Sequence, residues 1–125
     1  MVADEIRSFH DLVAWRKGIA LCKAVYQLTE AFPDRERFGL TSQLRRAAVS
    51  VPSNVAEGYG RRRTTDYLRF LDMARGSLCE IETQLVLARE LGFVSADVAT
   101  QCTCLIDELQ RILFGLARSV RESAD

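Results

Sequence analysis

The residues best suited to a chemical role are three consecutive arginines in a glycine-rich segment. Arg61, Arg62 and Arg63 follow Tyr59 after a single glycine. The planar guanidinium group donates paired hydrogen bonds to phosphate oxygens, and an aromatic ring beside it can stack on a base. Together with Arg45, these arginines are the candidate site for nucleic acid or a protein partner. The alternative is that they are solvated or pair with acidic groups of a neighbouring subunit, and the sequence leaves both open.

Basic charge is concentrated in the middle of the chain. Seventeen basic residues balance seventeen acidic ones overall, so the formal net charge is zero. Between Arg35 and Arg75 there are nine basic and four acidic residues, whereas the remainder has eight basic and thirteen acidic. A neutral molecule is not steered toward nucleic acid or an anionic membrane by its net field. Any such role therefore requires a local patch.

A second group of polar residues recurs at steps of three and four within residues 40–57. Side chains at this spacing share one face of a helix, so these residues form what we term the polar stripe. The polar stripe forms a hydrogen-bonded network against a neighbouring helix, faces solvent, or faces a ligand, and the sequence does not decide among these. Its members are Gln43, Arg46, Ser50, Asn54 and Glu57.

Residues that could support catalysis or bind a metal are few. His10 is the only histidine, and Glu80 and Glu82 fall on different helix faces without the E-x-x-H spacing of di-iron bundles. The chain lacks a phosphate-binding loop of the G-x-x-x-x-G-K-[ST] type. We therefore expect a protein that is not an enzyme and that has no metal site and no cofactor. The cysteines, none of them in a C-x-x-C pair, are expected to be reduced thiols: Cys22, Cys79, Cys102 and Cys104.

Glycines and prolines divide the chain into four amphipathic segments that must position these residues. We expect helices over about residues 11–31, 40–57, 64–91 and 95 to the C-terminus. Thr64 or Thr65 would cap the third helix, Gly92 would end it, and Ser95 would cap the fourth. Pro52 predicts a kink in the second helix. Such helices with short loops favour one domain, residues 1–125, folded as an all-α up-down-up-down four-helix bundle.

The first and fourth helices have more apolar residues than one face can hold. Val25, Leu28, Ile106 and Leu113 fall outside the predicted main stripes, and exposed apolar patches usually mark contact surfaces. We therefore expect the bundle to associate with copies of itself. The predicted stripes are Leu12, Trp15, Ile19, Cys22, Tyr26 and Thr29 in the first helix, and Val98, Cys102, Leu105, Leu109, Ile112, Leu116 and Val120 in the fourth.

Membrane segments and export signals are not apparent in the sequence. The chain has no run of about 18 or more apolar residues, which a membrane-spanning helix needs. Residues 1–7 are charged and are not followed by an apolar run with a small-residue cleavage site. These features predict a cytoplasmic protein that does not engage a membrane.

Three longer segments of the chain resemble the "four helix bundle protein" family. They are residues 38–47 (FGLTSQLRRA), residues 50–58 (SVPSNVAEG) and the pattern FLxxAxGSLxExET over residues 70–83, together with Phe9-x-x-Leu12-x-x-Trp15 and Phe32-Pro33. The family includes proteins encoded in intervening sequences of large-subunit ribosomal RNA genes. It is similar to the accessory variability determinant of diversity-generating retroelements. The resemblance implies a four-helix bundle that assembles into a ring, commonly a homopentamer, without established catalytic activity.

Two functional hypotheses follow from the residues and the resemblance. In the first, a homo-oligomer binds RNA or DNA, or a nucleic-acid-handling protein such as a reverse transcriptase, through its Arg-rich middle. In the second, the protein is purely structural or regulatory, and its arginines contact other subunits. The dependence of nucleic-acid binding on salt separates the two hypotheses.

Overall fold

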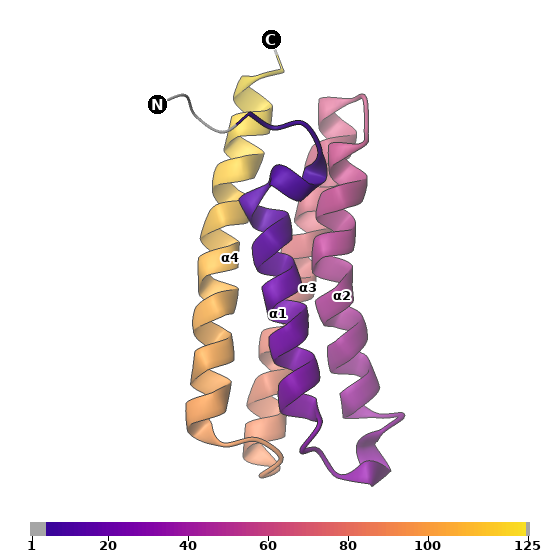
Figure 1. Ribbon diagram of the computed structural model, residues 1–125, viewed down its shortest axis with the longest axis vertical. Helices are drawn as coiled ribbons and strands as arrows, with labels where there is room; N and C mark the ends of the chain where they lie inside the picture. The colour runs from indigo at the N-terminus through magenta and orange to yellow at the C-terminus, as the bar shows by residue number, and fades with distance from the viewer. Residues whose placement is uncertain (1–4, 125) are drawn as a thin grey trace.

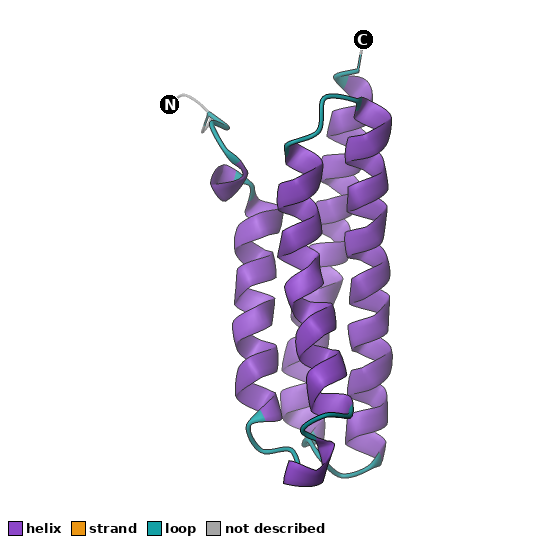
Figure 2. Cartoon of the chain, turned by 90° about the vertical axis from the view of Figure 1, so that its right-hand side faces the viewer, coloured by secondary structure: helices purple, strands orange, loops and turns teal. Residues whose placement is uncertain are grey.

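The computed structural model describes residues 5–124 as four long helices packed side by side (Figure 1). Two short 3-10 helices, η1 (Phe9–Asp11) and η2 (Asp34–Glu36), precede the first and second long helices. The described residues contain no strand, and the rest of them lie in loops and turns (Figure 2). The long helices are α1 (Val13–Thr29), α2 (Leu40–Tyr59), α3 (Thr64–Glu90) and α4 (Ala96–Glu122).

Each helix packs against the helix that follows it, and α4 packs back against α1. Chain direction alternates from helix to helix, as Figure 1 shows. The connection between α2 and α3 therefore lies at the end of the bundle where both termini emerge, and the other two connections lie at the opposite end. The prediction of an all-α, four-helix fold is confirmed.

Two of the three predicted helix-end signals are confirmed. The Ser95 hydroxyl accepts a hydrogen bond from the backbone N–H of Val98 at 3.2 Å, which caps α4. Gly92 has φ of +79°, and the N–H of Phe93 donates to the Ala88 carbonyl at 2.9 Å, closing the end of α3. The prediction that Thr64 or Thr65 caps α3 was wrong, because Arg63 occupies the cap position and makes no side-chain capping bond.

The predicted inward faces of α1 and α4 require correction. Val25, Leu28, Ile106 and Leu113, which were expected outside the main stripes, are buried in the core. Both helices have two adjacent apolar rows. The sequence pattern predicted that the row with more large side chains packs inward. The row that packs inward instead includes small residues, which let the helices approach closely. These small residues are Ala14, Gly18, Ala99 and Ala117.

The helices α1 and α2 approach closely at Pro52, through which α2 continues without interruption. Proline has no N–H, so the carbonyl of Ala48, four residues earlier, loses its donor within the helix. The Cys22 thiol of α1 donates to that carbonyl at 3.2 Å. A Cβ at Gly18 would lie 3.1 Å from the Pro52 Cβ, so only glycine fits without displacement. The kink predicted at Pro52 stays a prediction.

The four cysteines are all free thiols and divide into two reactivity classes. Burial raises the pKa of Cys22 and of Cys102 to about 11, whereas Cys79 and Cys104 are exposed. Because the thiolate is the reactive form, we expect an alkylating reagent near pH 8 to modify Cys79 and Cys104 in the folded protein. Cys22 and Cys102 should react only after unfolding. Peptide mass spectrometry with and without denaturant checks this, and equal modification of all four sites would contradict it.

Candidate functional site

The three consecutive arginines lie in the connection between α2 and α3, at the end of the bundle where the termini emerge (Figure 1). We term residues 61–63 the Arg loop. The Arg61 guanidinium pairs with the Glu57 carboxylate at 3.4 Å and lies 4.7 Å from the centre of the Phe70 ring. Arg62 and Arg63 are exposed, and their guanidinium groups form no ion pair or hydrogen bond with any of residues 5–124.

Aromatic side chains hold the two helices together directly beneath the Arg loop. The rings of Tyr59 and Tyr67 meet edge to face, with their centres 6.4 Å apart. Burial raises the pKa of the Tyr67 hydroxyl, and the neighbouring Tyr59 adds to the increase. A Cβ at Gly58 would lie 2.9 Å from the Phe70 Cβ, so α2 and α3 are in close contact there. The loop is thus mounted on a tightly packed base.

Arg45, which the sequence grouped with the Arg loop, lies near the opposite end of α2. Its Nε donates to the Thr29 hydroxyl at 2.8 Å, and its Nη2 donates to the Tyr26 carbonyl at 3.3 Å. The guanidinium also lies 4.5 Å from the centre of the Tyr26 ring. With a rise of about 1.5 Å per residue, Arg45 lies about 20 Å along the helix from Tyr59. The structure therefore separates Arg45 from the Arg loop and places it in the α1–α2 contact.

The polar stripe of α2 divides into exposed and half-buried members. Gln43, Arg46 and Glu57 are exposed, whereas Ser50 and Asn54 are half-buried. The Ser50 hydroxyl lies 2.6 Å from the Ser77 hydroxyl of α3 and 2.6 Å from its own helix's Ala47 carbonyl. Asn54 donates to the backbone carbonyl of Ser50 at 2.8 Å.

Gln84 of α3, which sequence reasoning missed, extends the contact between α2 and α3. Its side chain is only 7% exposed, and its Nε2 lies 3.4 Å from the Gln43 Oε1 and 3.3 Å from a Glu80 carboxylate oxygen. Its Oε1 is buried and has no hydrogen-bond partner. The spacing of Gln84 from Ile81 and Ala88, three and four residues, was the available signal. An open groove of about 430 Å³ lies here, lined by Gln43, Arg46, Ala47, Ser50, Ser77 and Glu80.

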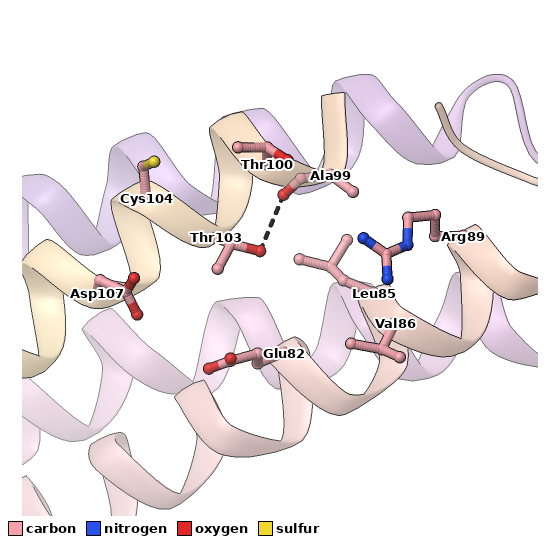
Figure 3. Close-up of a pocket in the computed structure, with 9 residues that line it drawn as sticks. All are labelled: Glu82, Leu85, Val86, Arg89, Ala99, Thr100, Thr103, Cys104 and Asp107. Atoms are coloured by element: carbon pink, nitrogen blue, oxygen red, sulfur yellow. Dashed lines mark hydrogen bonds between the residues drawn. The ribbon is translucent and has the colours of Figure 1, made fainter. Parts of the chain in front are cut away.

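A charged hollow of about 340 Å³ lies between α3 and α4, as Figure 3 shows. Glu82 and Asp107 approach it from opposite helices, and Arg89 lies toward the end of α3. The Thr103 hydroxyl is bonded to the Ala99 carbonyl of its own helix at 2.9 Å. Within residues 5–124 no cluster of three or more His, Cys, Asp or Glu side chains could hold a metal ion. The hollow is lined by Glu82, Leu85, Val86, Arg89, Ala99, Thr100, Thr103, Cys104 and Asp107.

The groove between α1 and α4 is mainly apolar. Lys17 of α1 forms an ion pair with Glu108 of α4 at 3.3 Å, and the groove contains two hollows. The first, of about 210 Å³, is lined by Leu12, Val13, Ala14, Ile112 and Leu116. The second, of about 320 Å³ and nearer the start of α4, is lined by Ala24, Gln27, Leu28, Val98, Gln101, Cys102 and Leu105. The apolar surface that α1 and α4 leave outside the core thus consists of different residues from those predicted.

None of the helices in the described part of the chain is both long and apolar enough to cross a membrane.

A comparison with protein families matches residues 10–115 to the family described as 23S rRNA-intervening sequence protein. No curated protein matches the chain. The matched segment includes α1, α2 and α3 in full and most of α4. The chain belongs to the 23S rRNA-intervening sequence protein family.

Proposed function

We propose that this protein is a non-enzymatic, self-associating helical bundle that binds single-stranded RNA through the Arg loop. The observation that carries the proposal is that the Arg62 and Arg63 side chains are exposed and unpaired among the described residues. They are therefore free to donate to phosphate oxygens, which supply most of the affinity in sequence-independent RNA binding.

The base of the Arg loop supports this assignment. Arg61 is held by Glu57 and by the Phe70 ring, and the close contact at Gly58 fixes the two helix ends. A fixed loop loses less conformational freedom on binding than a mobile one, which favours affinity. In an assembly, copies of the loop on one face would add to the local positive potential of an otherwise neutral protein.

Self-association is supported by the apolar groove between α1 and α4. Val13 and Val98 are exposed there, and Leu105, Ile112 and Leu116 are half-buried. Covering this groove with another copy removes apolar surface from water, which favours association. We propose a closed homo-oligomer, with the homopentamer that the resemblance implies as the first candidate. We also propose that α2 is kinked at Pro52, as the sequence predicts, because proline clashes with the preceding turn of a helix.

Replacing Arg62 and Arg63 with serine tests the RNA proposal. Loss of two phosphate contacts should weaken binding of a single-stranded oligonucleotide by about 10-fold or more at low salt, and should lower the salt dependence by about 1.4 units of log–log slope. Fluorescence anisotropy over a salt series measures both quantities. The wild type should show little preference among RNA sequences, because phosphates are the same in all of them.

The matched control is the double substitution of Arg89 and Arg111 with serine. Both residues are exposed and lie away from the Arg loop, so this variant has the same net charge as the test variant. It should retain most of the binding. Wild type that does not bind RNA at low salt, or an Arg loop variant that loses assembly instead, would favour the second hypothesis, a structural protein whose arginines contact other subunits.

A further inference from the structure

We propose that copies of the chain join by inserting Phe38 of one copy into the larger apolar hollow between α1 and α4 of the next. This inference rests on the self-association proposed above, and it names the contact. The hollow is the one lined by Ala24, Gln27, Leu28, Val98, Gln101, Cys102 and Leu105.

Phe38 is an aromatic side chain that its own bundle does not cover. It follows η2, and 88% of its surface is exposed, far more than for any other large hydrophobic residue among those described. The neighbouring aromatic residues behave differently, because Phe32 is buried and its ring packs on Phe93 with the centres 5.6 Å apart. The Arg37 guanidinium lies 5.4 Å from the centre of the Phe38 ring. Buried aromatic anchors of this kind dominate many protein interfaces.

The hollow has the size and chemistry to receive such a ring. Its volume is about 320 Å³, and its walls are the apolar side chains of Ala24, Val98 and Leu105. Leu28 and Cys102 are buried and form its floor. The two amide side chains, Gln27 and Gln101, are the polar groups of the lining. An apolar pocket with a few polar groups at its edge is the usual form of a binding pocket.

The segment that contains Phe38 and the hollow lie at the same end of the bundle but beside different helices. The segment between α1 and α2, which contains η2, lies beside α2, whereas the hollow lies between α1 and α4 (Figure 1). The second view places η2 in front of the bundle, on the side of α2 (Figure 2). Two copies standing side by side with parallel helices can therefore bring Phe38 of one to the hollow of the other. A contact between two different surfaces repeats until it closes a ring.

Charged residues lie near both surfaces, and some of them are of opposite sign. Arg35 and Arg37 precede Phe38, while Glu30 and Asp97 lie beside the hollow, next to α1 and at the start of α4. Glu30 and Asp97 are exposed and form no ion pair with any of residues 5–124. The same segment also contains Asp34, which is exposed, and Glu36, whose carboxylate accepts from the N–H of Leu40 at 3.0 Å and so lies toward the start of α2. The ion pairs that this contact would form are those of Arg35 and Arg37 with Glu30 and Asp97.

Substitution of Phe38 with alanine tests the contact. Because the side chain is exposed in the single chain, the variant should fold with unchanged helix content by circular dichroism. Its dissociation constant for self-association should rise by about 30-fold or more, as for other aromatic anchors, when measured by sedimentation equilibrium. Phe38→Leu, which keeps an apolar side chain, should lie between the two. A wild type that assembles and an alanine variant that assembles equally well would overturn this inference alone.

A mixing experiment separates this contact from other modes of assembly. Ala24→Arg fills the hollow but keeps Phe38, and Phe38→Ala empties the ring position but keeps the hollow. At a concentration at which each variant alone is monomeric, an equal mixture should form a dimer of one copy of each, held by the one intact contact. A mixture that remains monomeric, while the wild type assembles, would contradict the inference. A monomeric wild type would overturn both this contact and the proposed self-association.

Discussion

Truncation of Ile106 to alanine is expected to lower the free energy of unfolding by about 2–5 kcal/mol. Ile106 is 0% exposed and lies in the row of α4 that packs inward with Cys102, Leu109 and Leu113. Removing its side chain leaves a cavity among residues that are fixed by their own packing. Denaturant unfolding followed by circular dichroism, at one protein concentration for all variants, measures the loss.

Ile112 provides the matched control on the same helix. It is half-buried in the groove between α1 and α4, so its truncation to alanine removes fewer core contacts. We expect a loss of about 1 kcal/mol, the typical value for a point substitution. Equal losses, or a larger loss at Ile112, would mean that the row containing Leu105, Ile112 and Leu116 faces the core, as the sequence pattern alone indicated.

Substitution of Gly58 with alanine is expected to destabilise the fold by about 1–3 kcal/mol, although alanine favours helices. The new Cβ would lie 2.9 Å from the Phe70 Cβ and 3.0 Å from a ring carbon of Tyr67. Real Cβ atoms do not approach this closely, so α2 and α3 must separate beneath the Arg loop. Thermal unfolding of the variant measures the effect.

Gly76 gives the opposite expectation for the same change. It lies within α3, and apart from its chain neighbours and the nearby backbone of its own helix, no atom comes within 4 Å of the position its Cβ would take. Alanine there should stabilise the helix by about 0.5–1 kcal/mol, because it restricts the unfolded chain and adds no clash. A Gly58→Ala variant that is stabilised as much as Gly76→Ala would show that the contact beneath the Arg loop yields easily.

The sequence was sufficient for the number of helices and for most of their ends. Gly92 and Ser95 mark their positions through local backbone chemistry, which does not depend on the rest of the fold. Local sequence could not show which of the two apolar rows of α4 packs into the core. It depends on how closely α1 and α3 approach, and small residues such as Ala99 and Ala117 set that distance.

In the candidate site too, local features could be predicted from the sequence, whereas contacts between helices could not. Exposure of Arg61, Arg62 and Arg63 follows from their place in a short glycine-rich connection, and it could be expected from the sequence. The role of Arg45 could not, because its partners Tyr26 and Thr29 lie on another helix. The same holds for the hydrogen bond from Cys22 to the carbonyl that Pro52 leaves without a donor. Contacts between distant parts of the chain depend on the packed bundle and not on local pattern.

The cyclic order of helix contacts has a kinetic consequence. Among the four long helices, the contact between α1 and α4 is the one that does not join neighbours in sequence. Local hairpins such as α2 with α3 close small loops and form early, whereas joining α1 to α4 closes most of the chain and comes late. The hollow between α1 and α4 exists only after that last step. A nascent or partly folded chain therefore lacks the binding site for Phe38 of another copy. Assembly is in this way coupled to the completion of folding.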